Sequence, residues 1–218
     1  MKIQVLTDKN SWIIKKYKLD IVNKLKNFCK SISFIHNYKD LKKNYSINII
    51  LSYSKIIPKK FLEKSIINLV VHESDLPKGK GMSPLTWQIL KNKKYIFFTL
   101  FNASSKIDNG KIYFKKKVFF KKNLIFDEIK KIQFDEGLNL IIKFIKYYNR
   151  YKKEPKFIIQ KGKSTYYRRR NKNDSKLNIN LSIKKQFNLL RINDNHNYPS
   201  FFSYLGSKYI IKLYRLKK

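Results

Sequence analysis

The chain has 218 residues, which is the length of one domain, or of one domain with a small appendage. Its hydrophobic content of 43% excludes wholesale disorder, and no apolar run reaches the roughly 18 residues that cross a bilayer. The net charge of +36 attracts polyanions such as nucleic acid, but the lysines are dispersed among many Asn, Ile, Phe and Tyr residues, which favours compositional drift in an AT-rich genome.

The first part of the chain alternates apolar runs with a helical pattern. We expect strands at 2–6, 31–35 and 47–51. A helix from Trp12 to about Lys30, capped by Ser11, fits between the first two strands. Its buried face is predicted to carry Leu19, Val22, Leu25 and Phe28. A short helix is expected to begin at Pro58. This alternation predicts a mostly parallel, Rossmann-like α/β sheet flanked by helices.

The stretch from residue 66 to residue 90 organises the chain. The apolar run 66–71 has the character of a buried strand, and it ends on His72. A polar loop with two glycines follows, and Pro84 suits the first position of a helix for which Ser83 is the expected N-cap. Since ligands bind where such strands end, His72 is predicted to face a ligand.

Downstream, the pattern returns to strands and then to one long helix. Strands are expected at 95–101 and 112–120, and the Asn109-Gly110 turn between them places Asp108 where the loop re-enters a strand. The range 123–149 predicts a long amphipathic helix. Its inner face should carry Ile129, Ile132, Leu140, Ile141, Phe144 and Ile145.

The tail from residue 151 to residue 218 is predicted to be a short helix and strand extension of the domain formed by residues 1–150. A hinge is expected at 152–155, then a helix that Ser182 caps and a last strand at 209–214. Three arginines lie beside two tyrosines before that helix. Guanidinium and aromatic groups stack on RNA bases, but one nucleotide base with a diphosphate needs the same chemistry.

Two ordered motifs resemble a known family. The pattern His-x-Ser-x-Leu-Pro-x-x-Lys-Gly-x-x-Pro, from His72 to Pro84, and the segment from Lys106 to Ile112 resemble the signatures of formyltetrahydrofolate-dependent formyltransferases. The form of the first motif is most similar to that of sugar N-formyltransferases in surface-glycan pathways, including pseudaminic-acid-type pathways. The resemblance implies 10-formyltetrahydrofolate as formyl donor and a nucleotide-linked amino sugar as acceptor.

The resemblance also assigns residues. It implies His72 and Asp108 as catalytic residues, because a histidine can stabilise an oxyanion or move a proton and a carboxylate orients it. The residues expected to bind the folate are Tyr53, Ser54, Lys55, Ile56, Ile57, Leu76, Leu100, Phe101, Asn102, Ala103 and Ile107. Those expected to bind the acceptor are Lys9, Asn10, Ser11, Lys80, Gly81, Ser83, Trp87, Arg168, Arg169 and Arg170.

One position departs from the family pattern. The family's catalytic asparagine lies two residues before the histidine, where this chain has Val70. Asn102 is one candidate to replace it. Asn68 is another, although it would lie about 13 Å from His72 along a regular strand at roughly 3.3 Å per residue. Gln88 or a backbone N–H could also serve.

Other functions remain open. The acceptor could instead be methionyl-tRNA or a ribonucleotide, although the tail is shorter than the C-terminal domain with which tRNA formyltransferases hold tRNA. The chain could also be a catalytically inactive, basic RNA-binding module. No metal site is expected, since no Cys, His and carboxylate cluster has ligand spacing. One cysteine and an early-charged N-terminus predict a cytoplasmic protein with no membrane or specific nucleic-acid partner, and homodimerisation is left open.

Overall fold

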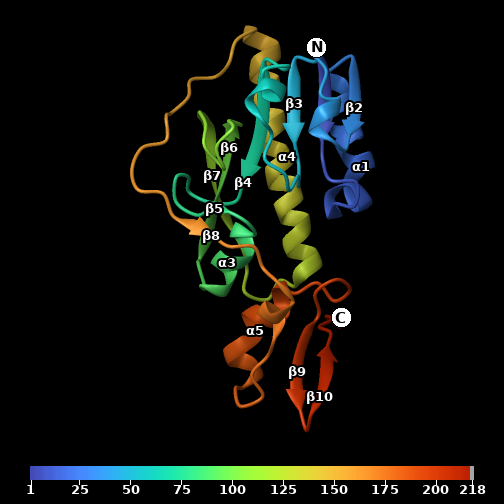
Figure 1. The fold of residues 1–218 in the computed structure, drawn as a ribbon, viewed down its shortest axis with the longest axis vertical. Helices are drawn as coiled ribbons and strands as arrows, with labels where there is room; N and C mark the ends of the chain where they lie inside the picture. The colour runs from blue at the N-terminus through green and yellow to red at the C-terminus, as the bar shows by residue number, and fades with distance from the viewer. Residues whose placement is uncertain (217–218) are drawn as a thin grey trace.

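A six-stranded mixed sheet forms the centre of the protein, in a computed structural model that describes residues 1–216 (Figure 1). The strands are β1 (Lys2–Leu6), β2 (Ser31–Ile35), β3 (Ile47–Ile50), β4 (Ile67–His72), β5 (Lys80–Gly81), β6 (Tyr95–Asn102), β7 (Ile112–Phe119), β8 (Tyr166–Tyr167), β9 (Ser200–Tyr204) and β10 (Ser207–Ile211). The α-helices are α1 (Trp12–Leu25), α2 (Lys59–Leu62), α3 (Pro84–Leu90), α4 (Phe126–Tyr151) and α5 (Ile183–Ile192). Short 3₁₀ helices span Lys26–Phe28, Tyr38–Asp40 and Lys172–Ser175.

The central sheet has the order β2-β1-β3-β4-β6-β7. The first four strands are parallel, and β6 and β7 join antiparallel, with His72 opposite Thr99. The predicted Rossmann-like, mostly parallel sheet is therefore confirmed. Because β1, β3 and β4 are parallel, their carboxyl ends meet at one edge of the sheet, where ligands bind in such folds.

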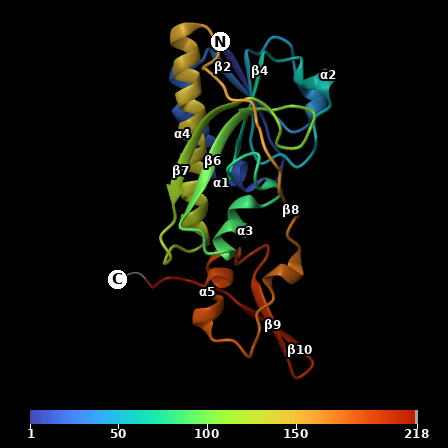
Figure 2. The same cartoon turned by 90° about the vertical axis from the view of Figure 1, so that its left-hand side faces the viewer.

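The two faces of the sheet are covered differently. On one face, α1 and α4 pack together over the main core, and the ring of Tyr17 stacks on Phe134 with 4.1 Å between centroids. On the other face, the segment 38–62 closes a smaller core around Leu41 and Leu62. Helix α4 runs along the whole sheet (Figures 1 and 2). Its predicted inner face is confirmed: every expected residue is buried except Ile132, which is partly buried.

Two local predictions about helix starts and faces were wrong. The buried residues of α1 are Ile13, Tyr17, Ile21 and Leu25, so of the predicted face Leu25 is confirmed, Val22 and Phe28 are partly buried, and Leu19 is 77% exposed. The helix meets α4 through the row that contains Tyr17, and it ends at Leu25, before the predicted Lys30. Ser83 precedes α3 with a left-handed backbone (φ +53°), and its side chain makes no capping hydrogen bond. A side-chain cap normally needs an extended backbone at that position.

The C-terminal part, from residue 152 onward, crosses the outside of the sheet and then extends below it (Figure 2). Strand β8 pairs with β5, α5 packs on α3 and α4, and the hairpin of β9 and β10 projects away. Ser182 caps α5, as predicted. The last strand ends at Ile211, so the predicted strand at 209–214 was placed too late; Leu213 instead pairs with the side chain of Asn195.

None of the helices within residues 1–216 combines the length and the apolar character needed to cross a bilayer.

Candidate active site

A cleft of about 650 Å³ lies over the carboxyl ends of β1, β3 and β4. The end of β4 forms the floor of the cleft, and the cleft extends from there toward both faces of the sheet. One side is formed by the loop after β3 and the loop between β6 and β7, and the other by the start of α1 and the first half of α4. We call the first side the loop arm (the lining residues 50–57, 101, 103, 104 and 106–108) and the second the helix arm (Asp8, Trp12, Ile13, Glu73, Lys130, Gln133, Phe134, Gly137 and Leu138).

His72 ends β4 and lies in the middle of this cleft, with 6% of its surface exposed. Its Nε2 lies 2.8 Å from the carbonyl oxygen of Gly79. Its Nδ1 lies 3.6 Å from Oδ1 of Asp108, within ion-pair range and beyond a normal hydrogen bond. Because both His72 and Asp108 line the cleft, a ligand atom can lie against both.

Asp108 reaches this place from the loop between β6 and β7. Its Oδ2 accepts a hydrogen bond from the N–H of Gly81 at 2.7 Å, which joins the two predicted motifs directly. Its backbone is left-handed (φ +42°), a conformation that aspartate and asparagine adopt more readily than most residues. Gly81 has φ +96°, and a Cβ at this position would lie 2.3 Å from the carbonyl oxygen of Tyr167. The close approach of β5 to β8 therefore requires glycine there.

Gln160 fixes the backbone around Asp108. Its Nε2 donates to the carbonyl oxygens of Asp108 at 3.0 Å and Gly110 at 3.2 Å. The same segment pairs with the start of β7 through two hydrogen bonds between Ile112 and Ile158. The sequence analysis did not identify Gln160, because it lies 52 residues from Asp108 in a segment without a motif.

Most of the residues predicted to bind a folate line the loop arm: Tyr53, Ser54, Lys55, Ile56, Ile57, Phe101, Ala103 and Ile107. Ile56 and Ile107 expose 58% and 49% of their surface, so the arm offers apolar side chains to a ligand. Leu76 and Leu100 are instead buried in the core below the cleft, and Asn102 does not line it.

The residues predicted to bind an acceptor are dispersed. Gly81 and Ser83 line the cleft. Lys80 is buried beside it, and Lys9 and Asn10 are exposed outside it. Ser11 is buried, because its hydroxyl bonds to Thr7 and caps α1, so this serine stabilises the helix start.

The three arginines lie outside the cleft, and two of them, Arg168 and Arg170, hold the C-terminal part together. Arg168 forms a two-bond ion pair with Asp174, which lowers the pKa of that carboxyl to about 2, and its guanidinium lies 4.7 Å from the ring of Trp87. The indole of Trp87 donates to the carbonyl of Arg168. Arg170 donates to the carbonyl of Asp174 and to Asn193. Arg169 is exposed, so it is the member of the trio most available to a ligand.

Neither asparagine proposed to replace the family's amide lies in the cleft. The Asn68 side chain is buried, accepting from Asn48 and donating to the carbonyl of Leu62. The Asn102 side chain accepts from the N–H of Asn68. Gln88 donates to two backbone carbonyls. These amides stabilise the strand ends, and Val70 contributes only an apolar surface to the cleft.

The sequence analysis did not predict that the helix arm forms one side of the cleft. It contains Trp12 from α1, Glu73 after β4, and Lys130 and Gln133 from α4. Polar residues three apart on a helix, next to its buried face, were a signal in the sequence, but only the packing of α4 shows that they border a cleft.

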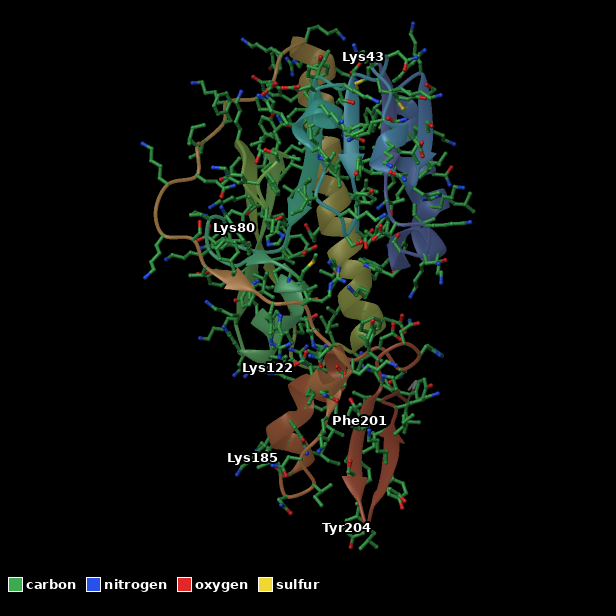
Figure 3. All side chains as sticks on the ribbon, viewed as in Figure 1. Lys43, Lys80, Lys122, Lys185, Phe201 and Tyr204 are labelled. Atoms are coloured by element: carbon green, nitrogen blue, oxygen red, sulfur yellow. The ribbon has the colours of Figure 1, made fainter. Side chains whose placement is uncertain are left out.

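The positive charge is spread over the molecule. Figure 3 labels Lys43, Lys122 and Lys185, all exposed, at well-separated positions. No group of three or more His, Cys, Asp or Glu residues in the described part of the chain could hold a metal ion.

Comparison with known proteins identifies the family to which the chain belongs. A family model described as "Formyl transferase" matches residues 13–144. The methionyl-tRNA formyltransferase of Thermodesulfovibrio yellowstonii is 31% identical over 179 residues, which are 81% of this chain and 56% of that protein. The chain therefore spans about half the length of this curated relative.

Solved structures show the same fold. A methionyl-tRNA formyltransferase from Clostridium thermocellum superposes with a TM-score of 0.79 at 24% identity, covering 100% of this chain and 94% of that one. A sugar N-formyltransferase from Shewanella sp superposes with a TM-score of 0.67 at 16% identity, covering 100% and 99%. At these identities the likeness is one of fold.

Proposed function

Since the chain belongs to the formyl transferase family, we propose that it transfers a formyl group from 10-formyltetrahydrofolate to the amino group of a nucleotide-linked amino sugar. The observation that carries the proposal is the pair of His72 and Asp108, which come from two separate motifs and meet in one cleft. The sugar assignment rests on the form of the His72 motif, and the structural likeness to a sugar N-formyltransferase is compatible with it.

The reaction needs a stabilised oxyanion and a route for one proton. The amine nitrogen attacks the formyl carbon, a C–N bond forms, and the carbonyl becomes an oxyanion. When the intermediate collapses, the bond from carbon to N10 of the folate breaks, the amine loses a proton and N10 gains one. Nε2 of His72 faces the carbonyl of Gly79, so Nδ1 is the atom that, in the imidazolium form, is suited to donate to the oxyanion and to relay this proton, and Asp108 orients the ring.

The loop arm is the proposed site of the donor. Members of this family use formyltetrahydrofolate, and the arm combines the exposed Ile56 and Ile107 with the backbone of residues 53–55. Apolar walls with a few polar groups are typical of sites for flat, partly polar ligands. Because Val70 stands where the family pattern has an asparagine, His72 is expected to supply a larger share of the oxyanion stabilisation.

Methionyl-tRNA is a second candidate acceptor, because the relative at 31% identity is a methionyl-tRNA formyltransferase. The net charge of +36 is also compatible with a polyanionic substrate. The basic RNA-binding module without activity is less well supported, since His72 and Asp108 are retained and face one another.

Parallel assays with both kinds of acceptor test the proposal. The purified chain, incubated with 10-formyltetrahydrofolate, is expected to add the mass of one carbonyl group to a nucleotide-linked amino sugar, as measured by mass spectrometry. Formylation of methionyl-tRNA alone would establish the second candidate instead. RNA binding that persists near physiological salt, with no formylation of any acceptor, would refute the enzymatic assignment altogether.

Gln160 gives a prediction about the positioning of Asp108. Gln160→Leu removes both hydrogen bonds to the loop carbonyls, so we expect kcat to fall roughly three- to tenfold at hydrogen-bond energies of about 1 kcal/mol, with little change in KM for the donor. Lys161→Leu is the matched control, because its side chain is exposed on the same segment. Equal kinetics for the two variants would show that Gln160 has no role in placing Asp108.

A further inference from the structure

The helix arm has no occupant in the proposal above. The loop arm accommodates the donor, and His72 lies between the two arms. The amine must reach the formyl carbon beside His72, so the rest of the acceptor extends from there. The inference below rests on the proposed function and concerns what the helix arm recognises.

Lys130 is the distinctive residue of this arm. Its Nζ donates to Oε1 of Gln133 at 2.8 Å and lies 4.3 Å from the ring centroid of Trp12. None of the ion pairs within residues 1–216 includes it. Burial lowers the pKa of this ammonium to about 8, against the opposing charges of Glu73 and Asp194. An ammonium has three donors, so one amide acceptor leaves it under-satisfied.

The carboxylates of the arm are directed to other partners. Glu73 accepts from Nε2 of Gln133 at 2.7 Å, and Asp8 accepts from the N–H of Ser54 at 3.0 Å. Gln133 therefore lies between Lys130 and Glu73, with its oxygen toward the cation and its nitrogen toward the anion. This arrangement leaves N–H donors of Lys130 available inside a cleft that a ligand can enter.

We propose that Lys130 binds a phosphate oxygen of the acceptor and so places the acceptor in the helix arm, with its amine directed to His72. A phosphate oxygen would take the free donors of the ammonium in surroundings where a charge is costly without a partner. Both acceptors considered above carry phosphate, as a nucleotide diphosphate or in the tRNA end. Lys130 therefore contributes to specificity by favouring amine acceptors that carry phosphate over amines that carry none.

The first arm of the test measures anion binding without any donor. Lys130→Met keeps the length of the side chain and removes its charge, and Lys143→Met removes one exposed lysine from the same helix as a control for net charge. Calorimetry with inorganic pyrophosphate, near physiological salt, should show a loss of affinity of about tenfold or more for Lys130→Met and little loss for Lys143→Met. Equal losses would overturn the inference.

The second arm measures kinetics with the acceptor. Lys130→Met should raise KM for the phosphate-bearing acceptor by about tenfold, while KM for 10-formyltetrahydrofolate stays close to that of the wild type. The acceptor whose KM responds, nucleotide sugar or methionyl-tRNA, identifies the source of the phosphate. An unchanged acceptor KM in an active enzyme would overturn the inference and leave the proposed function standing.

Folding and function are separated by two further readouts. Because Lys130→Met removes a partly buried charge that has no ion-pair partner, its melting temperature should equal or exceed that of the wild type. A protein that does not fold would be replaced by Lys130→Gln, which keeps a polar end. Pyrophosphate binding that depends on Lys130, in a protein that formylates no acceptor, would support the anion site and refute the proposed function.

Discussion

His72→Ala is expected to lower turnover by about 100-fold or more, because His72 alone supplies a titratable donor at the floor of the cleft among the described lining residues. Its replacement removes the contacts with Gly79 and Asp108 together. The amide that would share this work in the family pattern is replaced by Val70, so little stabilisation should remain. The measurement is kcat with saturating donor and acceptor.

The control for this variant is His36→Ala. His36 follows β2 at the edge of the same sheet, its Nδ1 lies 3.1 Å from the carbonyl of Thr7, and it does not line the cleft. Circular dichroism should show both variants folded, since His72 ends a strand whose core residues are unchanged. Turnover of folded His72→Ala within about threefold of the wild type would contradict a catalytic role for this histidine.

Asp108→Asn is expected to lower kcat by about 10- to 100-fold while preserving the loop. Asparagine tolerates the left-handed backbone of this position, and its side-chain oxygen can still accept from the N–H of Gly81. The substitution therefore removes the negative charge that lies 3.6 Å from Nδ1 of His72, with little change in geometry. The loss of kcat measures how much this charge contributes to orienting and stabilising the imidazole in the transition state.

Asp108→Ala provides the comparison for this experiment. It removes the charge and the hydrogen bond to Gly81 and leaves a residue that adopts positive φ less readily. We expect it to be less active than Asp108→Asn and less stable to heat. If Asp108→Asn were as active as the wild type while Asp108→Ala lost activity, Asp108 would act as a turn residue that shapes the loop.

The sequence was informative where local patterns determine structure. Alternating apolar runs and helical periodicity predicted the strands of the parallel half and the inner face of α4, because buried elements carry a periodic signal. The face of α1 was misjudged, since Leu19 and Tyr17 both fit a helical repeat and only the contact with Phe134 selects the row of Tyr17. Propensity and spacing do not decide between such neighbouring rows.

Part of the candidate site was also predicted from local patterns in the sequence. Motifs contiguous in sequence gave His72, Asp108 and much of the loop arm, which the structure brings to one cleft. Polar residues outside the motifs were harder to assign, because their partners are distant in the chain. Asn68 was a candidate to replace the family's asparagine, but its side chain bonds to Asn48 and to the carbonyl of Leu62 in the core. Arg168 was expected to bind a ligand and is paired with Asp174.

The sequence by itself therefore determined the α/β class, the strand that ends on His72 and the family to which the chain is similar, because these depend on periodicity and on short contiguous motifs. Only the tertiary structure decided that Lys130 and Gln133 of α4 border the cleft, that Gln160 holds the Asp108 loop, and that two of the three arginines are occupied. Each of these facts depends on contacts between residues far apart in the chain, and the packing of α4 and of the C-terminal segment on the sheet fixes them.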